Sequence, residues 1–284
     1  MLAAAASQSQ WDERIARARS LVTAYPAAGE LLSFYAALAE LQKSLVSRGE
    51  ISPDPAPRDS VTSRRLLVET LDLDRVIDAL PPFLSWLPQA VPKHVGAPTD
   101  ELLEYGRDDW RELLRRFING VAEDVSPAAA DEGPLAAFVT EAVLQPFAEQ
   151  LAVQSTSRPD VDSHPPMRCP RCGALPVAAV LREEGHGAKR FLVCALCLTE
   201  WECLRVMCPA CGEKQFDRLP VYTAEQFAHV RIDACDHCQR YVKTIDLTKN
   251  GLAVPCVDDI ASVSLDLWAR ERGYARVKRN VLGL

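Results

Sequence analysis

The sequence predicts an α+β multi-domain protein: an N-terminal all-α helical bundle, then tandem rubredoxin- or zinc-ribbon-like metal-binding units, and a C-terminal helix. Two observations carry this prediction. Four Cys-x-x-Cys pairs fall between residues 169 and 238 and use eight of the ten cysteines, whereas the first 168 residues contain none. Residues 8–152 instead show mainly the 3.6-residue hydrophobic period of helices. At 284 residues the chain is long enough for two domains.

The helical bundle is expected to span residues 1–153 and to contain about five or six helices. Prolines divide its apolar segments, because proline lacks the N–H of a helical hydrogen bond and clashes with the preceding turn. Between these breaks, helices are expected at about 9–25, 62–80, 99–119 and 134–152. One more helix is indicated by an apolar stripe with helical spacing, made of Leu31, Phe34, Leu38, Leu41 and Leu45.

An uncharged stretch from Ala79 to Val91 interrupts this pattern with three prolines. It is too short to span a bilayer. We expect its part from Leu80 to Val91 to be a turn between helices that packs on the core. The alternative is that this apolar segment forms the surface that meets a partner.

The second half of the chain divides at its cysteines. A polar run at 154–166 predicts a linker. A first four-cysteine unit is expected at 167–205 and a second at 206–248, followed by a C-terminal helix and tail at 249–284. That helix is expected at about 258–274, with an apolar face formed by Ile260, Val263, Leu267 and Trp268.

Each Cys-x-x-Cys pair can wrap a tight turn that points two thiolates at one tetrahedral ion. The sequence Cys-Pro-Arg-Cys-Gly at 169–173 returns as Cys-Pro-Ala-Cys-Gly at 208–212, and strand-like runs at 191–193 and 229–232 lead to the next pair. This repeat favours sequential pairing, although only residues 198–207 separate the middle pairs, which leaves a crossed arrangement open. The expected ligands are Cys169, Cys172, Cys194 and Cys197 in site 1, and Cys208, Cys211, Cys235 and Cys238 in site 2.

Disulfides and thioredoxin-like chemistry are the alternatives to metal sites. The N-terminus has no signal-peptide pattern and the chain has no membrane-spanning stretch, so we expect a cytoplasmic protein, where structural disulfides are rare. A redox Cys-x-x-Cys pair opens a helix, whereas Pro170 and Gly173 favour a turn. Metal binding is therefore the favoured interpretation.

The spacing alone leaves the metal open between zinc and iron and slightly favours zinc. Glycine after the second cysteine, at Gly173 and Gly212, lets backbone N–H groups turn toward sulfur, which helps to tune an iron site. Leu198 and Gln239 stand at the matching positions of the other two pairs. The remaining Cys203 and Cys256 are expected to be small buried side chains rather than reserve ligands, and His186 and His237 to be exposed turn residues.

Charge and motifs argue against several classes of function. Residues 1–167 carry 15 basic and 25 acidic side chains, a net −10, and residues 168–284 carry 17 and 14, a net +3, which sum to −7. Nucleic-acid binding needs a denser basic footprint than this. No catalytic motif is visible, and the acidic neighbours Asp108-Asp109 and Glu183-Glu184 are typical of solvated faces. A site filled by four cysteines offers no open position to substrate, so we expect no enzyme.

The residues around the cysteines resemble the formate dehydrogenase accessory protein (FdhE) family. Neither the Thr-Glu-Trp after the second pair nor the Gly-Tyr near the C-terminus is required for metal binding, which makes the resemblance specific. It extends over about 168–276, and over 1–155 only in length and helical character. The segments that carry it are 169–177, 194–201, Arg205-Val206, 235–243, 258–262 and 271–276.

The resemblance implies a cytoplasmic accessory protein that is needed for the activity of respiratory formate dehydrogenases. It implies binding to the catalytic subunit through a scaffold with two rubredoxin-like iron sites, so that iron becomes the expected metal and zinc the alternative. Self-association stays open. Two further hypotheses remain, a rubredoxin-like electron carrier and a zinc-ribbon nucleic-acid-binding protein. Because the bundle contains no ligand, we expect it to keep its fold when metal is removed.

Overall fold

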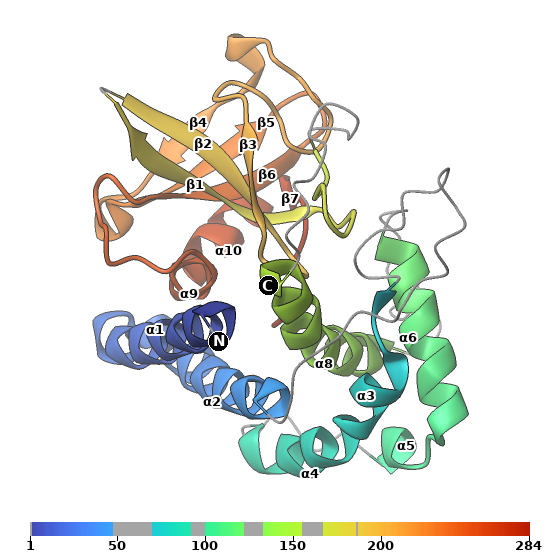
Figure 1. The fold of residues 1–284 in the computed structure, drawn as a ribbon. Helices are drawn as coiled ribbons and strands as arrows, with labels where there is room; N and C mark the ends of the chain where they lie inside the picture. Colours follow the sequence, from blue (N-terminus) through green and yellow to red (C-terminus); the bar gives the residue numbers. More distant parts are fainter. Residues whose placement is uncertain (1, 48–69, 92–99, 122–132, 155–166, 186) are drawn as a thin grey trace.

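The computed structural model describes residues 2–47, 70–91, 100–121, 133–154, 167–185 and 187–284. Helices from the N-terminal half pack beside one twisted sheet formed by the C-terminal half, which confirms the α+β fold class (Figure 1). None of the described helices combines the length and the apolar character that a membrane crossing requires.

Three long helices form the part of the N-terminal region that lies nearest the sheet. They are α1 (Leu2–Ala24), α2 (Gly29–Val46) and α8 (Gly133–Gln154), and the short 3-10 turn η1 (Pro26–Ala28) joins the first two. The expected stripe on α2 faces the core: Leu38 is buried and Phe34 packs against the aromatic rings of α4 and α8.

The outer helices differ from the expectation in two places. They are α3 (Leu73–Asp78), α4 (Leu80–Ala90), α5 (Asp100–Leu103) and α6 (Arg107–Val121). The stretch from Leu80 was expected to be a turn and is helical, because two of its prolines fall in the first turn, where their missing N–H has no intrahelical acceptor. The expected helix at 99–119 is two helices, and residues 62–69 of the expected helix at 62–80 lie outside the described residues.

One seven-stranded sheet contains both cysteine units. Its strands follow the order β3-β2-β1-β6-β5-β4, and β7 pairs with β6. The parallel pairing of β1 with β6, with Ala179 opposite Thr244, joins the two units. The proposed domain boundaries stay a prediction. The strands are β1 (Pro176–Glu184), β2 (Gly187–Cys194), β3 (Glu200–Cys203), β4 (Val221–Thr223), β5 (Val230–Cys235), β6 (Arg240–Asp246) and β7 (Ala275–Arg276).

The C-terminal helix is broken into α9 (Pro255–Ala261) and α10 (Val263–Glu271). The hydroxyl of Ser262 donates to the carbonyl oxygen of Asp258 at 2.8 Å, a local bond that competes with helix continuation. The break rotates the expected apolar face, so that Leu267 is 55% exposed while Leu265 and Ala269 are buried. α9 lies between the sheet and helices α1 and α2 (Figure 1).

A buried charge network fixes this C-terminal segment to β6. The side chain of Lys243 is fully buried, and its Nζ lies 2.5 Å from Asp266 Oδ2 and 3.2 Å from Asp259 Oδ1. Arg276 forms ion pairs with both carboxylates. Because each buried charge has an opposite partner, the network positions α9 and α10 without leaving an isolated charge in the core.

Candidate metal centres

Site 1 forms where two tight turns meet at one end of β1 and β2. The Sγ atoms of Cys169 and Cys197 lie 3.6 Å apart, and those of Cys172 and Cys194 lie 3.3 Å apart. The chain reaches this arrangement because β1 and β2 form an antiparallel hairpin that returns the second pair to the first.

Site 2 repeats this arrangement on the antiparallel hairpin of β4 and β5, with its second pair at the turn from β5 to β6. Cys208 Sγ lies 3.7 Å from Cys238 Sγ, and Cys211 Sγ lies 3.7 Å from Cys235 Sγ. In each site the four sulfur atoms lie within 4.8 Å of one another. A tetrahedral ion with metal–sulfur bonds of about 2.3 Å separates its sulfurs by about 3.8 Å. The four-thiol sets therefore fit such an ion, and all eight cysteines are free of disulfide bonds.

Backbone conformation at the turns supports the same interpretation. Gly173 and Gly212 have φ values of 78° and 77°, and the non-glycine residues Leu198 and Gln239 have φ values of 52° and 54°. All four turns thus use the left-handed region, although the sequence departs from glycine at two of them. In this conformation backbone N–H groups turn toward sulfur: those of Leu196 and Cys197 each lie 3.4 Å from Cys194 Sγ.

The electrostatics of the clusters require a cation if all thiols are to ionise. Hydrogen bonds from the other three thiols of site 1, Cys172 first, lower the pKa of Cys169, whereas burial raises the pKa of Cys194. In site 2 burial raises the pKa of Cys238 to about 11. One thiolate therefore suppresses the ionisation of its neighbours, and a bound metal ion would reverse this.

The two sites differ in burial. All four cysteines of site 1 are buried, in the same hydrophobic core as helices α1, α2 and α8. The side-chain amide of Gln145 on α8 donates to the carbonyl oxygen of Ala195 at 3.1 Å. In site 2, Cys211 is exposed and Cys238 is half-buried. Site 1 thus lies at the junction with the helices, and site 2 lies at the surface.

The other candidate ligands lie outside both clusters. Cys203 is buried on β3, as expected. Cys256 is half-buried, and its sulfur accepts a hydrogen bond from the hydroxyl of Tyr35 at 3.4 Å. His237 is exposed, with its Nδ1 3.9 Å from Glu213. His186 lies outside the described residues.

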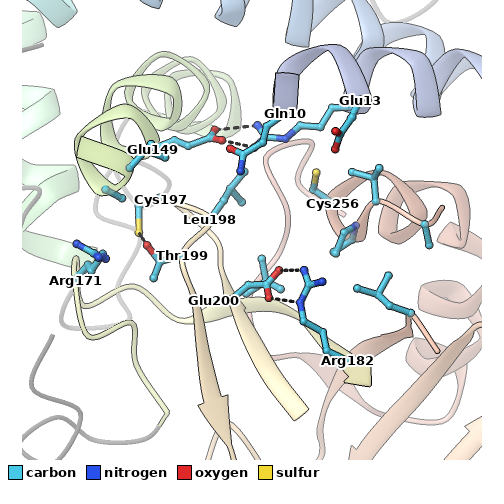
Figure 2. A pocket seen from close by; sticks show the side chains of 18 of the residues that line it. Gln10, Glu13, Glu149, Arg171, Arg182, Cys197, Leu198, Thr199, Glu200 and Cys256 are labelled. Carbon is cyan, nitrogen blue, oxygen red and sulfur yellow. Dashed lines mark hydrogen bonds and ion pairs between the residues drawn. The ribbon is translucent and has the colours of Figure 1, made fainter. Parts of the chain in front are cut away.

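A cleft of about 540 Å³ opens beside site 1, and sequence reasoning missed it (Figure 2). Its walls come from α1, α8, the turn at Cys197 and the loop before α9, segments that are far apart in the chain. Two ion pairs line it: Arg14 Nη1 donates to Glu149 Oε2 at 2.9 Å, and Arg182 Nε donates to Glu200 Oε2 at 2.8 Å. Cys197 of site 1 lines this cleft, although its side chain is buried.

The fold and the clusters together define a class: a protein in which a helical region packs on a sheet that bears two sets of four cysteines, each able to hold a metal ion. Residues 168–205 match the model of the FdhE central domain, and residues 206–282 match that of the FdhE C-terminal domain. Residues 168–282 thus match both domain models of the FdhE family, and the fold of the chain is similar to that of an FdhE protein.

Individual FdhE proteins are also similar to this chain. The FdhE homolog of Aquifex aeolicus is 45% identical over 116 residues, which cover 40% of this chain and 41% of that protein. The FdhE homolog of Edwardsiella ictaluri is 29% identical over 282 residues, which cover 96% of this chain and 88% of that protein. The crystal structure of the FdhE protein from Pseudomonas aeruginosa matches with a TM-score of 0.76 at 25% identity, covering 97% of this chain and 96% of that one.

Proposed function

We propose that this protein is a cytoplasmic, non-enzymatic accessory factor that binds the catalytic subunit of formate dehydrogenase during its maturation. The observation that supports this most strongly is the pair of closed four-thiol sets on an FdhE fold. Four cysteine ligands fill a tetrahedral shell, so a bound ion would have no open position for substrate. The sites then serve to hold a surface in shape for a partner.

We propose that Cys169, Cys172, Cys194 and Cys197 hold one iron ion and that Cys208, Cys211, Cys235 and Cys238 hold a second, with zinc as the alternative. The test is metal analysis with a visible absorption spectrum on protein purified without oxygen. Two iron ions per chain with thiolate-to-iron absorption are expected. A colourless protein with two zinc ions would contradict the iron assignment and leave the scaffold function standing.

The partner is tested by pull-down. Immobilised protein is expected to retain the catalytic subunit of formate dehydrogenase and not an unrelated protein of similar size and charge. A failure to retain that subunit, with both sites loaded, would contradict the accessory function.

Electron transfer is the second candidate, because the exposed Cys211 brings site 2 to the surface, where a redox partner could approach it. It predicts reversible reduction of an iron-loaded site and faster reoxidation by a protein partner than by solvent. A site that does not change oxidation state over the physiological range would remove this candidate.

A further inference from the structure

A second cavity, of about 180 Å³, lies next to site 2 and shares no lining residue with the cleft of Figure 2. We call it the basic pocket. It is formed by β2, β5, β6 and the loops that lead to Cys208 and to β4. Its charged lining residues are Arg190, Arg205, Arg231, Arg240 and Asp233.

The basic pocket has an excess of positive charge in a chain whose net charge is −7. Its lining contains four arginines and one carboxylate, that of Asp233. This carboxylate accepts hydrogen bonds from Arg231 Nε at 2.8 Å and from Thr244 Oγ1 at 2.7 Å, and it lies 3.2 Å from Arg190 Nη2. One acidic group is therefore shared between two guanidinium groups, and a further anion is favoured there.

Arg190 is the most buried of the four arginines. Its side chain is 2% exposed, and its Nη1 donates to the carbonyl oxygen of Met207 at 2.8 Å. Its Nε and Nη2 have no hydrogen-bond acceptor among the described residues, since the approach of Nη2 to Asp233 lacks hydrogen-bond alignment. A buried guanidinium with unused donors is costly unless an acceptor from outside completes it.

The rim of the pocket is apolar. Phe216 is 82% exposed, Val221 is 52% exposed and Val206 is 43% exposed, and all three line the cavity. Large apolar side chains gathered at the surface mark places where proteins meet. β4, which begins at Val221, is also an edge strand of the described sheet, so an extended segment can pair beside the pocket.

We propose that the basic pocket binds a glutamate or aspartate side chain from an extended, otherwise apolar segment of a protein partner. The volume is below the range of about 300–1,000 Å³ typical of small-molecule sites and suits one side chain. The apolar rim favours a peptide over nucleic acid, whose phosphates need a continuous basic track. The inference rests on the proposed function in that it names the chemistry by which an accessory protein recognises its partner.

The test uses two exposed lining residues, because replacing the buried Arg190 could disturb folding. The double variant Arg205→Glu, Phe216→Ser reverses one charge and removes the largest apolar side chain of the rim. The matched control is Arg270→Glu, Leu252→Ser: Leu252 is 81% exposed, and neither residue lines the pocket. Circular dichroism and metal content are measured to check that both variants keep the fold.

Two binding measurements are made at low and at physiological salt. The first uses the catalytic subunit of formate dehydrogenase, and the second uses a short fluorescent peptide of alternating leucine and glutamate. We expect the pocket variant to weaken both by at least about tenfold, and the control variant to leave both unchanged. A peptide with lysine in place of glutamate is expected not to bind.

The outcomes separate the two proposals. If the subunit binds wild type and pocket variant equally, the pocket inference is wrong while the accessory function stands. If the subunit binds neither but the acidic peptide binds only the wild type, the pocket is supported and the proposed partner is wrong. A third measurement uses single-stranded DNA. If DNA binds the wild type but not the pocket variant, and the acidic peptide does not bind the wild type, the inference is overturned in favour of nucleic acid.

Discussion

Gln239 adopts the left-handed backbone conformation that glycine adopts at the matching position of two of the four cysteine turns. Its φ is 54°, whereas Gly173 and Gly212 reach 78° and 77°. The left-handed region costs an L-residue roughly 1–2 kcal/mol, while glycine adds about 0.5–1 kcal/mol of unfolded-state entropy. Strain of this kind survives where the surrounding contacts fix the turn, as the thiol cluster does here.

Replacing Gln239 by glycine is therefore expected to raise the free energy of unfolding by about 0.5 kcal/mol. The side chain is exposed, and the bond that it would lose, from Nε2 to the carbonyl oxygen of Asp236, is at the surface. Urea denaturation of the metal-loaded protein measures the change. Gln239→Ala is the control: it loses the same bond, keeps the strain and should not stabilise. Equal effects of the two replacements would show that strain at φ 54° is unimportant.

The difference in burial between the sites predicts different rates of metal release. Cys211 is exposed, whereas every sulfur of site 1 is buried. A coloured chelator is expected to remove metal in two phases, with site 2 emptied first. Cys211→Ser should remove the fast phase and Cys172→Ser the slow one. A single phase, or loss of the slow phase in Cys211→Ser, would contradict the assignment of fast release to site 2.

At the scale of elements, the carboxylate of Asp258 on α9 links this helix to α1 and to the segment before β5. It accepts hydrogen bonds from Arg17 on α1, at 2.6 and 3.0 Å, and from the backbone N–H of Val254 before α9, at 2.8 Å. His229 Nε2, just before β5, lies 2.7 Å from it. Burial by itself would raise the pKa of Asp258, but the bonds with His229 and Arg17 outweigh it and lower the pKa.

A carboxyl whose folded-state pKa lies below its unfolded value of about 3.9 stabilises the fold above that value. The stabilisation is lost as the pH falls through the lower, folded-state pKa. Asp258→Asn is therefore expected to cost about 3 kcal/mol at pH 7 and progressively less below about pH 4. Unfolding by urea between pH 7 and pH 3 measures this. The control, Asp108→Asn, replaces a carboxylate that is 96% exposed and should change stability by less than about 0.5 kcal/mol.

Several elements follow from sequence patterns, and others do not. The apolar stripe of α2 and the hairpins between cysteine pairs depend on local spacing, which a sequence displays directly. The helix at Leu80–Ala90 does not follow from proline content alone, because two of its prolines lie in the first turn, where proline is tolerated. The break at Ser262 and the parallel pairing of β1 with β6 depend on side-chain bonds and on contacts between distant segments.

At the scale of the whole molecule, the contrast between local spacing and contacts of distant segments also applies to the cysteine sites and the two cavities. Spacing is enough to predict which thiols approach one another, because each short hairpin returns one pair to the next; that they bind metal stays a prediction. The cleft beside site 1 and the basic pocket could not be predicted, since each is assembled from segments separated by long stretches of chain. The ion pair of Arg14 and Glu149 in the cleft likewise joins residues that are 135 positions apart.

The hydrophobic core extends across the predicted boundary between the helical bundle and the cysteine units. One hydrophobic cluster contains Leu38 of α2, Phe147 of α8, Val257 of α9 and the four cysteines of site 1. Gln145 adds a hydrogen bond from α8 to the turn of that site. A cysteine-free helical region suggests independence from metal, whereas a shared core couples the two, because loosening one side exposes the other.

Cys172→Ser is therefore expected to weaken the helices as well as site 1. With a metal ligand lost inside the shared core, we expect the unfolding midpoint to fall by about 10 °C, or about 3 kcal/mol, and amide exchange in α8 to quicken. Cys211→Ser, at the surface, should leave exchange in α8 unchanged. Hydrogen exchange read by mass spectrometry compares the two variants. If α8 stays equally protected in both, the helical region is independent of site 1 and the shared core does not carry the coupling.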